Sequence, residues 1–149
     1  MAQADHEVRN GQKVIIIEAS SNSNAHAWNT RLDDSKYESY AANLQSALRE
    51  MMPDVTIFQN RVPKEFIFSD NYMQLIPGGE NVFEMIPRMW AFEVSTVIID
   101  EKTIGGKKVP IKKDILLYSK LMCRTWPHCS SLAKRIARMY DEYEQANGD

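Results

Sequence analysis

Residues 13–19 (KVIIIEA) constrain the fold most, because their unbroken apolar run predicts a strand that is covered on both faces. Between residues 35 and 51, apolar side chains recur at spacings of three and four, which is the pattern of an amphipathic helix. Pro53 ends that helix, and residues 55–59 (VTIFQ) form a second predicted strand. The strand–helix–strand order is long enough for a right-handed parallel crossover and indicates the α/β class.

The second half of the chain predicts a hairpin and a final helix. Residues 91–100 (AFEVSTVIID) and 115–121 (ILLYSKL) are the third and fourth predicted strands. Five lysines and Gly105-Gly106 lie between them, so we expect residues 102–113 to form a long exposed hairpin. A second helix with one apolar face follows Trp126-Pro127. The predicted fold is therefore β-α-β-β-β-α, with a four-stranded mixed sheet and two helices.

The 149 residues fit one domain, and 44% hydrophobic and 26% charged residues are ordinary for a globular protein. We expect a flexible tail over residues 1–12, one domain over 13–145 with an insertion at 61–86, and a C-terminal tail over 146–149. The net charge of −2 gives no general attraction to nucleic acid or to acidic membranes. No apolar run approaches the ~20 residues that span a bilayer.

The N-terminal residues are polar and resemble neither a signal peptide nor an Arg-rich transit peptide. A cytoplasmic location is therefore the default expectation, with an organellar or cytoskeletal assembly left open. Two cysteines in 149 residues do not suggest a secreted disulfide scaffold.

Several stretches resemble one known family. Residues 87–94 (PRMWAFEV), 116–121 (LLYSKL) and 126–136 (WPHCSSLAKRI) are similar to the P-R-x-G-A-F-E-V motif, the S-K-L hairpin end and the last helix of the Rdx family. That family includes selenoproteins W, T and H and their cysteine homologues. Residues 35–60 resemble its first helix and second strand. The resemblance covers most of residues 13–145 and implies a thioredoxin-like fold.

The turn after the first strand carries Cys-x-x-Cys or Cys-x-x-selenocysteine in that family. A helix N-terminus stabilises the attacking thiolate there, and the second group resolves the mixed disulfide. This chain has Ser20-Ser21-Asn22-Ser23 instead, and serine forms no disulfide. We therefore expect Ser20 and Ser23 to mark a degenerate redox turn without catalysis. A hydrolase would need a base such as His26, but no G-x-S-x-G motif exists, so a helix-capping polar turn is the preferred interpretation.

Cys123 and Cys129 flank the predicted turn between the hairpin and the last helix, and they are the alternative thiols. Cys129 lies near a helix start, where the macrodipole would favour its thiolate. Together with His128 they offer three potential metal ligands, which is a weak signal in a single loop. Structural cysteines are the preferred interpretation, and we expect no metal and no cofactor.

The insertion holds aromatic and methionine side chains that the predicted core does not need, so they pack either on the chain's own sheet or on a partner. Trp90 and Arg124 stand where the Rdx family usually has glycine, and a tryptophan beside the former redox turn would block a disulfide substrate. The expected partner-binding residues are Phe66, Phe68, Tyr72, Phe83, Met85 and Trp90.

These observations predict a non-catalytic thioredoxin-like protein that acts as a protein-binding or structural subunit of a larger assembly. The alternative is a thiol-disulfide oxidoreductase or redox sensor that uses Cys123 or Cys129. Nucleic acid is not an expected partner, because only the lysines of residues 102–113 favour it and no aromatic residue interleaves them. A membrane is not an expected partner either.

Overall fold

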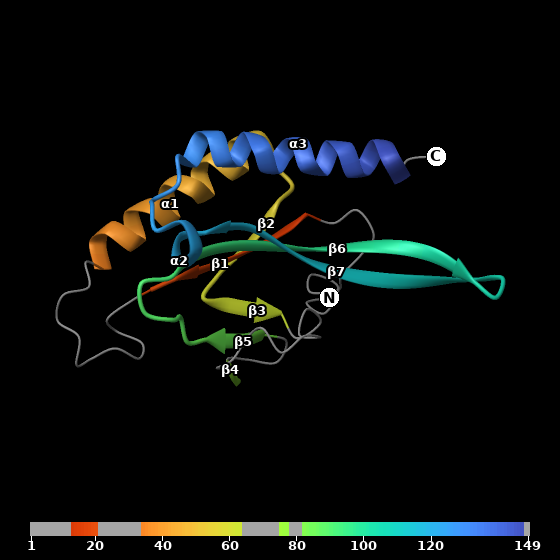
Figure 1. The fold of residues 1–149 in the computed structure, drawn as a ribbon, viewed down its shortest axis with the longest axis horizontal. Coiled ribbons are helices and arrows are strands. Elements are labelled where there is room, and N and C mark those ends of the chain that lie inside the picture. The colour runs from red at the N-terminus through yellow and green to blue at the C-terminus, as the bar shows by residue number, and fades with distance from the viewer. Residues whose placement is uncertain (1–12, 21–33, 64–74, 78–81, 148–149) are drawn as a thin grey trace.

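The computed structural model describes residues 13–20, 34–63, 75–77 and 82–147, which form seven strands and three helices. Four strands make the larger sheet, in the order β2-β1-β6-β7 (Figure 1). Strand β1 is parallel to β2 and antiparallel to β6, and β6 is antiparallel to β7. The α/β class and the four-stranded mixed sheet are confirmed. The bounds of the strands are Val14–Ala19 (β1), Thr56–Gln59 (β2), Phe92–Ile104 (β6) and Lys107–Ser119 (β7).

Two long helices lie on one face of this sheet (Figure 1). Helix α1 (Asp34–Met51) connects β1 to β2, and helix α3 (Cys129–Asn147) is the last element. A third helix, α2 (Lys120–Cys123), is one turn long, so the prediction of two helices was incomplete. The predicted fourth strand also ended two residues too late, because Ser119 caps α2 by accepting a hydrogen bond from the Met122 N–H at 3.1 Å.

Strand β1 is buried on both faces, as its sequence predicts. Ile15 and Ile17 belong to the main core, together with Leu44 and Leu48 of α1 and Ile136 of α3. Val14 and Ile16 belong to a second buried cluster on the other face, with Val62, Met85 and Val97. The helix positions spaced by three and four therefore pack on the sheet, while a different part of the chain covers its second face.

A small antiparallel sheet covers part of that second face. It has the order β3-β5-β4, with β3 at Arg61–Pro63, β4 at Leu75–Pro77 and β5 at Val82–Met85. Val62 and Met85 are buried against β1 and β6, so these parts of the predicted insertion contribute to the chain's own core.

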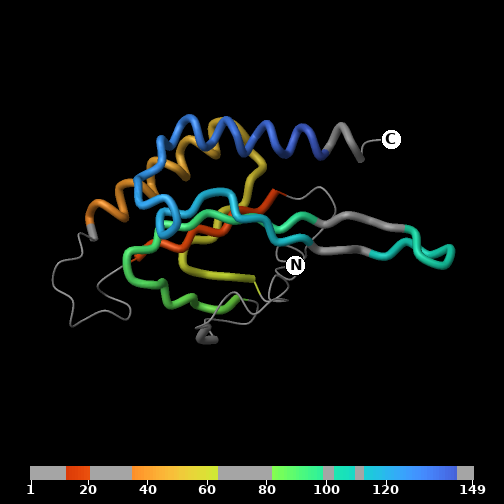
Figure 2. Tube along the Cα trace, viewed as in Figure 1, coloured from red at the N-terminus to blue at the C-terminus, as the bar shows by residue number. Residues whose placement is uncertain are grey.

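The long hairpin predicted over residues 102–113 is present, but its two strands run further than the predicted strand ends at Asp100 and Ile115. Strands β6 and β7 pair continuously from Glu93 opposite Ser119 to Ile104 opposite Lys107. Only Gly105 and Gly106 form the turn, with φ of 61° and 81°, and positive φ at both positions is what a type I′ hairpin turn needs. The lysines lie in strands because a two-stranded ribbon is open to water and accepts charged side chains. Its tip projects past the other strands (Figure 2).

Candidate functional site

Ser20 directly follows β1 and is 2% exposed. Its backbone N–H donates to the Ala91 carbonyl at 2.8 Å, and its Oγ accepts a hydrogen bond from the Trp90 N–H at 3.1 Å. Ser20 thus joins the end of β1 to the start of β6. A buried hydroxyl that binds a backbone amide suits a structural role, whereas a nucleophile needs an accessible oxygen. The other serine of the motif, Ser23, and His26 lie outside the described residues.

Trp90 is held next to Ser20 in a left-handed conformation, with φ of 68°. Its indole is partly exposed, and its carbonyl accepts a hydrogen bond from Lys120 Nζ at 3.3 Å. The same Nζ donates to the Tyr37 hydroxyl at 3.2 Å and lies over the ring of Trp126. Trp90 is therefore held by Ser20 after β1 and by Lys120 of α2, although a left-handed backbone costs an L-residue about 1–2 kcal/mol.

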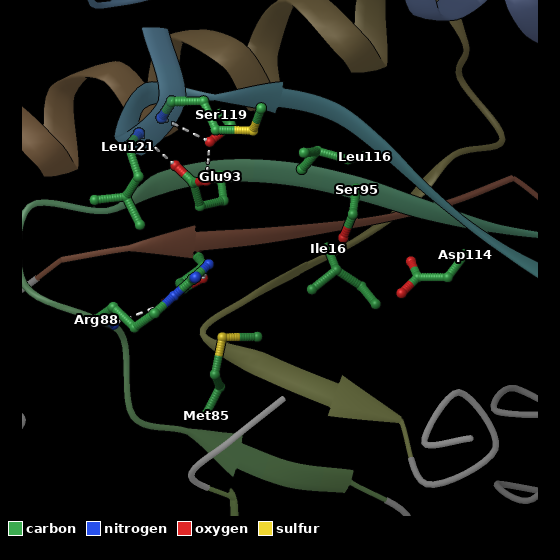
Figure 3. A pocket seen from close by; sticks show the side chains of 11 residues that line it. Ile16, Met85, Arg88, Glu93, Ser95, Asp114, Leu116, Ser119 and Leu121 are labelled. Carbon is green, nitrogen blue, oxygen red and sulfur yellow. Dashed lines mark hydrogen bonds and ion pairs between the residues drawn. The ribbon is translucent and has the colours of Figure 1, made fainter. Parts of the chain in front are cut away.

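A groove of about 370 Å³ lies on the sheet face opposite α1 and α3, beside the small sheet (Figure 3). This volume falls within the roughly 300–1,000 Å³ of small-ligand sites. Apolar and charged side chains alternate around it, and strands β1, β6 and β7 supply most of them. The lining residues are Ile16, Glu18, Met85, Arg88, Glu93, Ser95, Asp114, Leu116, Ser119, Leu121 and Met122.

Two buried carboxylates lie side by side in this groove. Glu18 of β1 is directly opposite Glu93 of β6, and Glu93 is directly opposite Ser119 of β7. Glu18 is 8% exposed and Glu93 is 7% exposed. Like charges directly opposite each other destabilise a sheet, so this pair needs compensating donors.

Arg88 provides the positive charge for Glu18. Its Nε and Nη2 donate to the two carboxylate oxygens at 3.0 and 2.8 Å, and its backbone N–H donates to Oε2 at 2.7 Å. The hydrogen bond with Glu18 raises the pKa of Arg88 above its ordinary value; partial burial opposes this, and the charges of Glu18 and Glu93 add to it. The forked geometry fixes the guanidinium over the acidic pair.

Glu93 uses neutral donors instead. Its Oε1 accepts a short hydrogen bond from Ser119 Oγ, and its Oε2 accepts one from the Leu121 N–H at 3.1 Å. Within the part of the chain that the structure describes, it forms no ion pair. Glu93 therefore orients the turn from β7 into α2 while its charge faces the groove.

The two cysteines have opposite environments. Cys123 is exposed at the end of α2, and hydrogen bonds with Thr125 and Tyr118 lower the pKa of its thiol. Its Sγ lies 3.4 Å from Thr125 Oγ1 and 3.2 Å from the Tyr118 hydroxyl. Cys129 begins α3 but is half-buried, and burial raises the pKa of its thiol. This direction is the reverse of the expectation that the helix start would favour a Cys129 thiolate.

The structure describes three of the six expected partner-binding residues. Met85 is buried in the second core cluster and also lines the groove, Phe83 is half-buried and Trp90 is exposed. Phe66, Phe68 and Tyr72 lie outside the described residues. Across the described ranges, no three His, Cys, Asp or Glu side chains are grouped to hold a metal ion. No helix in those ranges is long and apolar enough to cross a membrane.

The sequence reasoning missed Glu18, Arg88 and Glu93. A signal was present, because each glutamate interrupts an otherwise apolar strand, in VIIIEA and in AFEVS. A charge inside a buried strand indicates a paired or functional group. The sequence gives no such signal for Ser95 or Asp114 as groove residues, because polar residues are ordinary in half-exposed strands.

Compared with family models, with curated proteins and with solved structures, the chain has no significant match in any of the three. The function proposed below therefore rests on the residues of this chain and on their geometry.

Proposed function

We propose that this protein is a non-catalytic thioredoxin-like domain of the Rdx type, which serves as a protein-binding subunit of a larger assembly. The strand order β2-β1-β6-β7 supports this assignment, with a parallel β1-α1-β2 unit, an antiparallel β6-β7 hairpin and a final helix. This β-α-β-β-β-α order, with the small sheet inserted between β2 and β6, is the one we expect for a thioredoxin-like fold.

Backbone conformation at two positions also supports the Rdx resemblance. Trp90 and Arg124 occupy places where that family usually has glycine, and their φ values are 68° and 63°. Among the described non-glycine residues, only Asn60 shares a positive φ. Glycine adopts this conformation without steric cost, whereas tryptophan and arginine do not. Positive φ at both positions is the conformation in which a glycine, as in the Rdx motifs, would be favoured.

The observation that carries the non-catalytic assignment is the state of Ser20. Ser20 stands where the resemblance implies the first redox cysteine, and its hydroxyl is buried and bound to the Trp90 N–H. Disulfide exchange requires a thiolate that attacks and forms a mixed disulfide, and a serine hydroxyl can do neither. Cys123 and Cys129 are both free thiols, at the end of α2 and at the start of α3.

An insulin-reduction assay tests this proposal, with dithiothreitol or a thioredoxin-reductase system as the electron source. We expect no turnover above the rate without protein, while a thioredoxin in the same assay is active. Turnover that disappears in Cys123→Ser or in Cys129→Ser would overturn the proposal and favour the oxidoreductase alternative.

Cys123 supports a second candidate function, a thiol that reports the redox state of its surroundings. It is exposed, and hydrogen bonds with Thr125 and Tyr118 lower the pKa of its thiol. Reactive cysteines have these two properties. Exposure of the protein to oxidised glutathione should then give a mixed disulfide at Cys123. Intact-mass spectrometry of the wild type and of Cys123→Ser would detect it, and equal labelling of the two proteins would eliminate this candidate.

A further inference from the structure

The groove between the two sheets carries an excess of negative charge. Glu18 and Glu93 line it with two buried carboxylates, and Arg88 is its basic residue. Arg88 directs its hydrogen bonds at Glu18, so that Glu18 has a cation beside it. Glu93 is 7% exposed and makes no ion pair with any residue that the structure describes. Buried charges are normally paired, and a cation in the groove would complete this arrangement.

Glu93 can still accept hydrogen bonds. A carboxylate offers about four acceptor positions, and the donors from Ser119 and Leu121 use two of them. Ser95, two residues further along β6, also lines the groove, and its hydroxyl forms no hydrogen bond with the described residues. Figure 3 shows Glu93 and Ser95 along the same side of the groove. N–H donors of a bound group would therefore find acceptors there.

An anionic ligand fits this groove poorly. The Arg88 N–H groups that point into the fold are already bound to Glu18. An anion beside Arg88 would also lie near the carboxylate of Glu93, whose charge already acts on that guanidinium. Electrostatic complementarity therefore favours a positively charged ligand.

Apolar side chains border the charged centre. Leu116 is 54% exposed and Met122 is 77% exposed, and both line the groove. Met85 and Ile16 line its inner side, next to the small sheet (Figure 3). Exposed leucine and methionine beside a polar centre are typical of protein-binding surfaces. They suit a ligand whose charged group is flanked by apolar groups.

We infer that this groove binds an arginine or lysine side chain, flanked by apolar residues, from an extended segment of a partner protein. The inference rests on the proposed function, because it treats the protein as a binding subunit, and it adds the chemistry of the segment that is bound. In an extended segment, residues two apart point to the same side. Leucines two positions before and after the basic residue would then lie on the same side as its charge, where the apolar lining residues Leu116 and Met122 suit them.

A peptide titration followed in the amide NMR spectrum of the full chain tests this inference. The probe is the capped pentapeptide Leu-Ala-Arg-Ala-Leu, and its matched control replaces arginine with citrulline, which is neutral and nearly identical in shape. We expect saturable shift changes at the amides of Ser95, Leu116 and Leu121. Affinity for the citrulline peptide should be about tenfold or more lower, because the ion pair is lost.

Variants of the protein provide a second test. Glu93→Gln should weaken binding of the arginine peptide about tenfold or more, whereas Glu142→Gln, an exposed position on α3, should not change it. Because Glu93 also supports α2, Met122→Lys is an independent probe: this exposed rim position can carry a repelling charge without disturbing the core. Met122→Gln is its uncharged control, and only the lysine should reduce the affinity for the arginine peptide.

Three results would overturn the inference: no saturable shifts at millimolar peptide, equal affinity for the arginine and citrulline peptides, or tighter binding of Leu-Ala-Glu-Ala-Leu. The last result would assign the groove to anions through Arg88. The peptide titration and the insulin-reduction assay give independent results. A failed titration leaves the absence of reductase activity unaffected, and reductase activity would leave peptide binding unaffected. Failure of the inference and failure of the proposed function are therefore distinguishable.

Discussion

The side-chain hydroxyl of Ser20 accepts a hydrogen bond from the backbone N–H of Trp90 at 3.1 Å. This bond ties the residue after β1 to the residues that lead into β6, far along the chain. In our proposal these positions correspond to a redox cysteine and to a glycine of the Rdx family. A redox cysteine would have to stay accessible for disulfide exchange, whereas Ser20 is buried and joins two strands.

Replacement of Ser20 by alanine should lower the free energy of unfolding by about 1–3 kcal/mol, because the Trp90 N–H loses its acceptor in a buried place. Urea denaturation followed by tryptophan fluorescence measures this. Ser46→Ala, at an exposed position of α1, is the control and should change the value by about 0.5 kcal/mol or less. Equal stability of the two variants would show that the hydroxyl is dispensable.

Arg124→Gly should increase the free energy of unfolding by roughly 0.5–1 kcal/mol. Arg124 ends α2 with φ of 63°, and glycine relieves this strain while it increases the entropy of the unfolded chain. Arg138→Gly, at an exposed position inside α3, should instead lower the free energy by about 1 kcal/mol. Thermal or urea unfolding of both variants gives the comparison, and a similar loss in both would argue against strain at Arg124.

Leu48→Ala should lower the free energy of unfolding by about 2–5 kcal/mol, because Leu48 is fully buried between α1, α3 and β1. Asn43→Ala, on the exposed side of α1, should have an effect of about 0.5 kcal/mol or less. Urea denaturation of the two variants measures the difference. A negligible loss at Leu48 would contradict the packing of α1 on the sheet.

The two cysteines should alkylate over different pH ranges. Hydrogen bonds with Thr125 and Tyr118 lower the pKa of Cys123, so that a larger fraction is thiolate near pH 7 and it reacts faster with iodoacetamide. Burial raises the pKa of Cys129, which should react only at higher pH. Peptide mass spectrometry across pH measures both rates. Tyr118→Phe should move the Cys123 profile to higher pH, and an unchanged profile would exclude this hydrogen bond as a cause.

The fold class was predictable because its signals are local. The apolar run at residues 14–17 predicted a strand buried on both faces, and Leu44 and Leu48 follow the three-and-four spacing of a packed helix. The hairpin was also predictable, but its strands are longer than expected. The pairing of Ile104 with Lys107 across two glycines shows that the strands continue to the turn.

The groove was not predictable in the same way, because it depends on pairing between distant segments. Glu18 and Glu93 become neighbours only through the antiparallel register of β1 and β6. Arg88 reaches Glu18 from the segment between β5 and β6. Each glutamate was visible as a charge in an apolar strand, but its partner is set by tertiary structure.

Sedimentation of the native protein in an extract of its own cells tests the central claim most directly. The account predicts that the protein migrates with a large assembly and that little of it sediments as a free monomer. Migration only as a free monomer, in an extract where known assemblies remain intact, would contradict the account that this protein is a binding subunit.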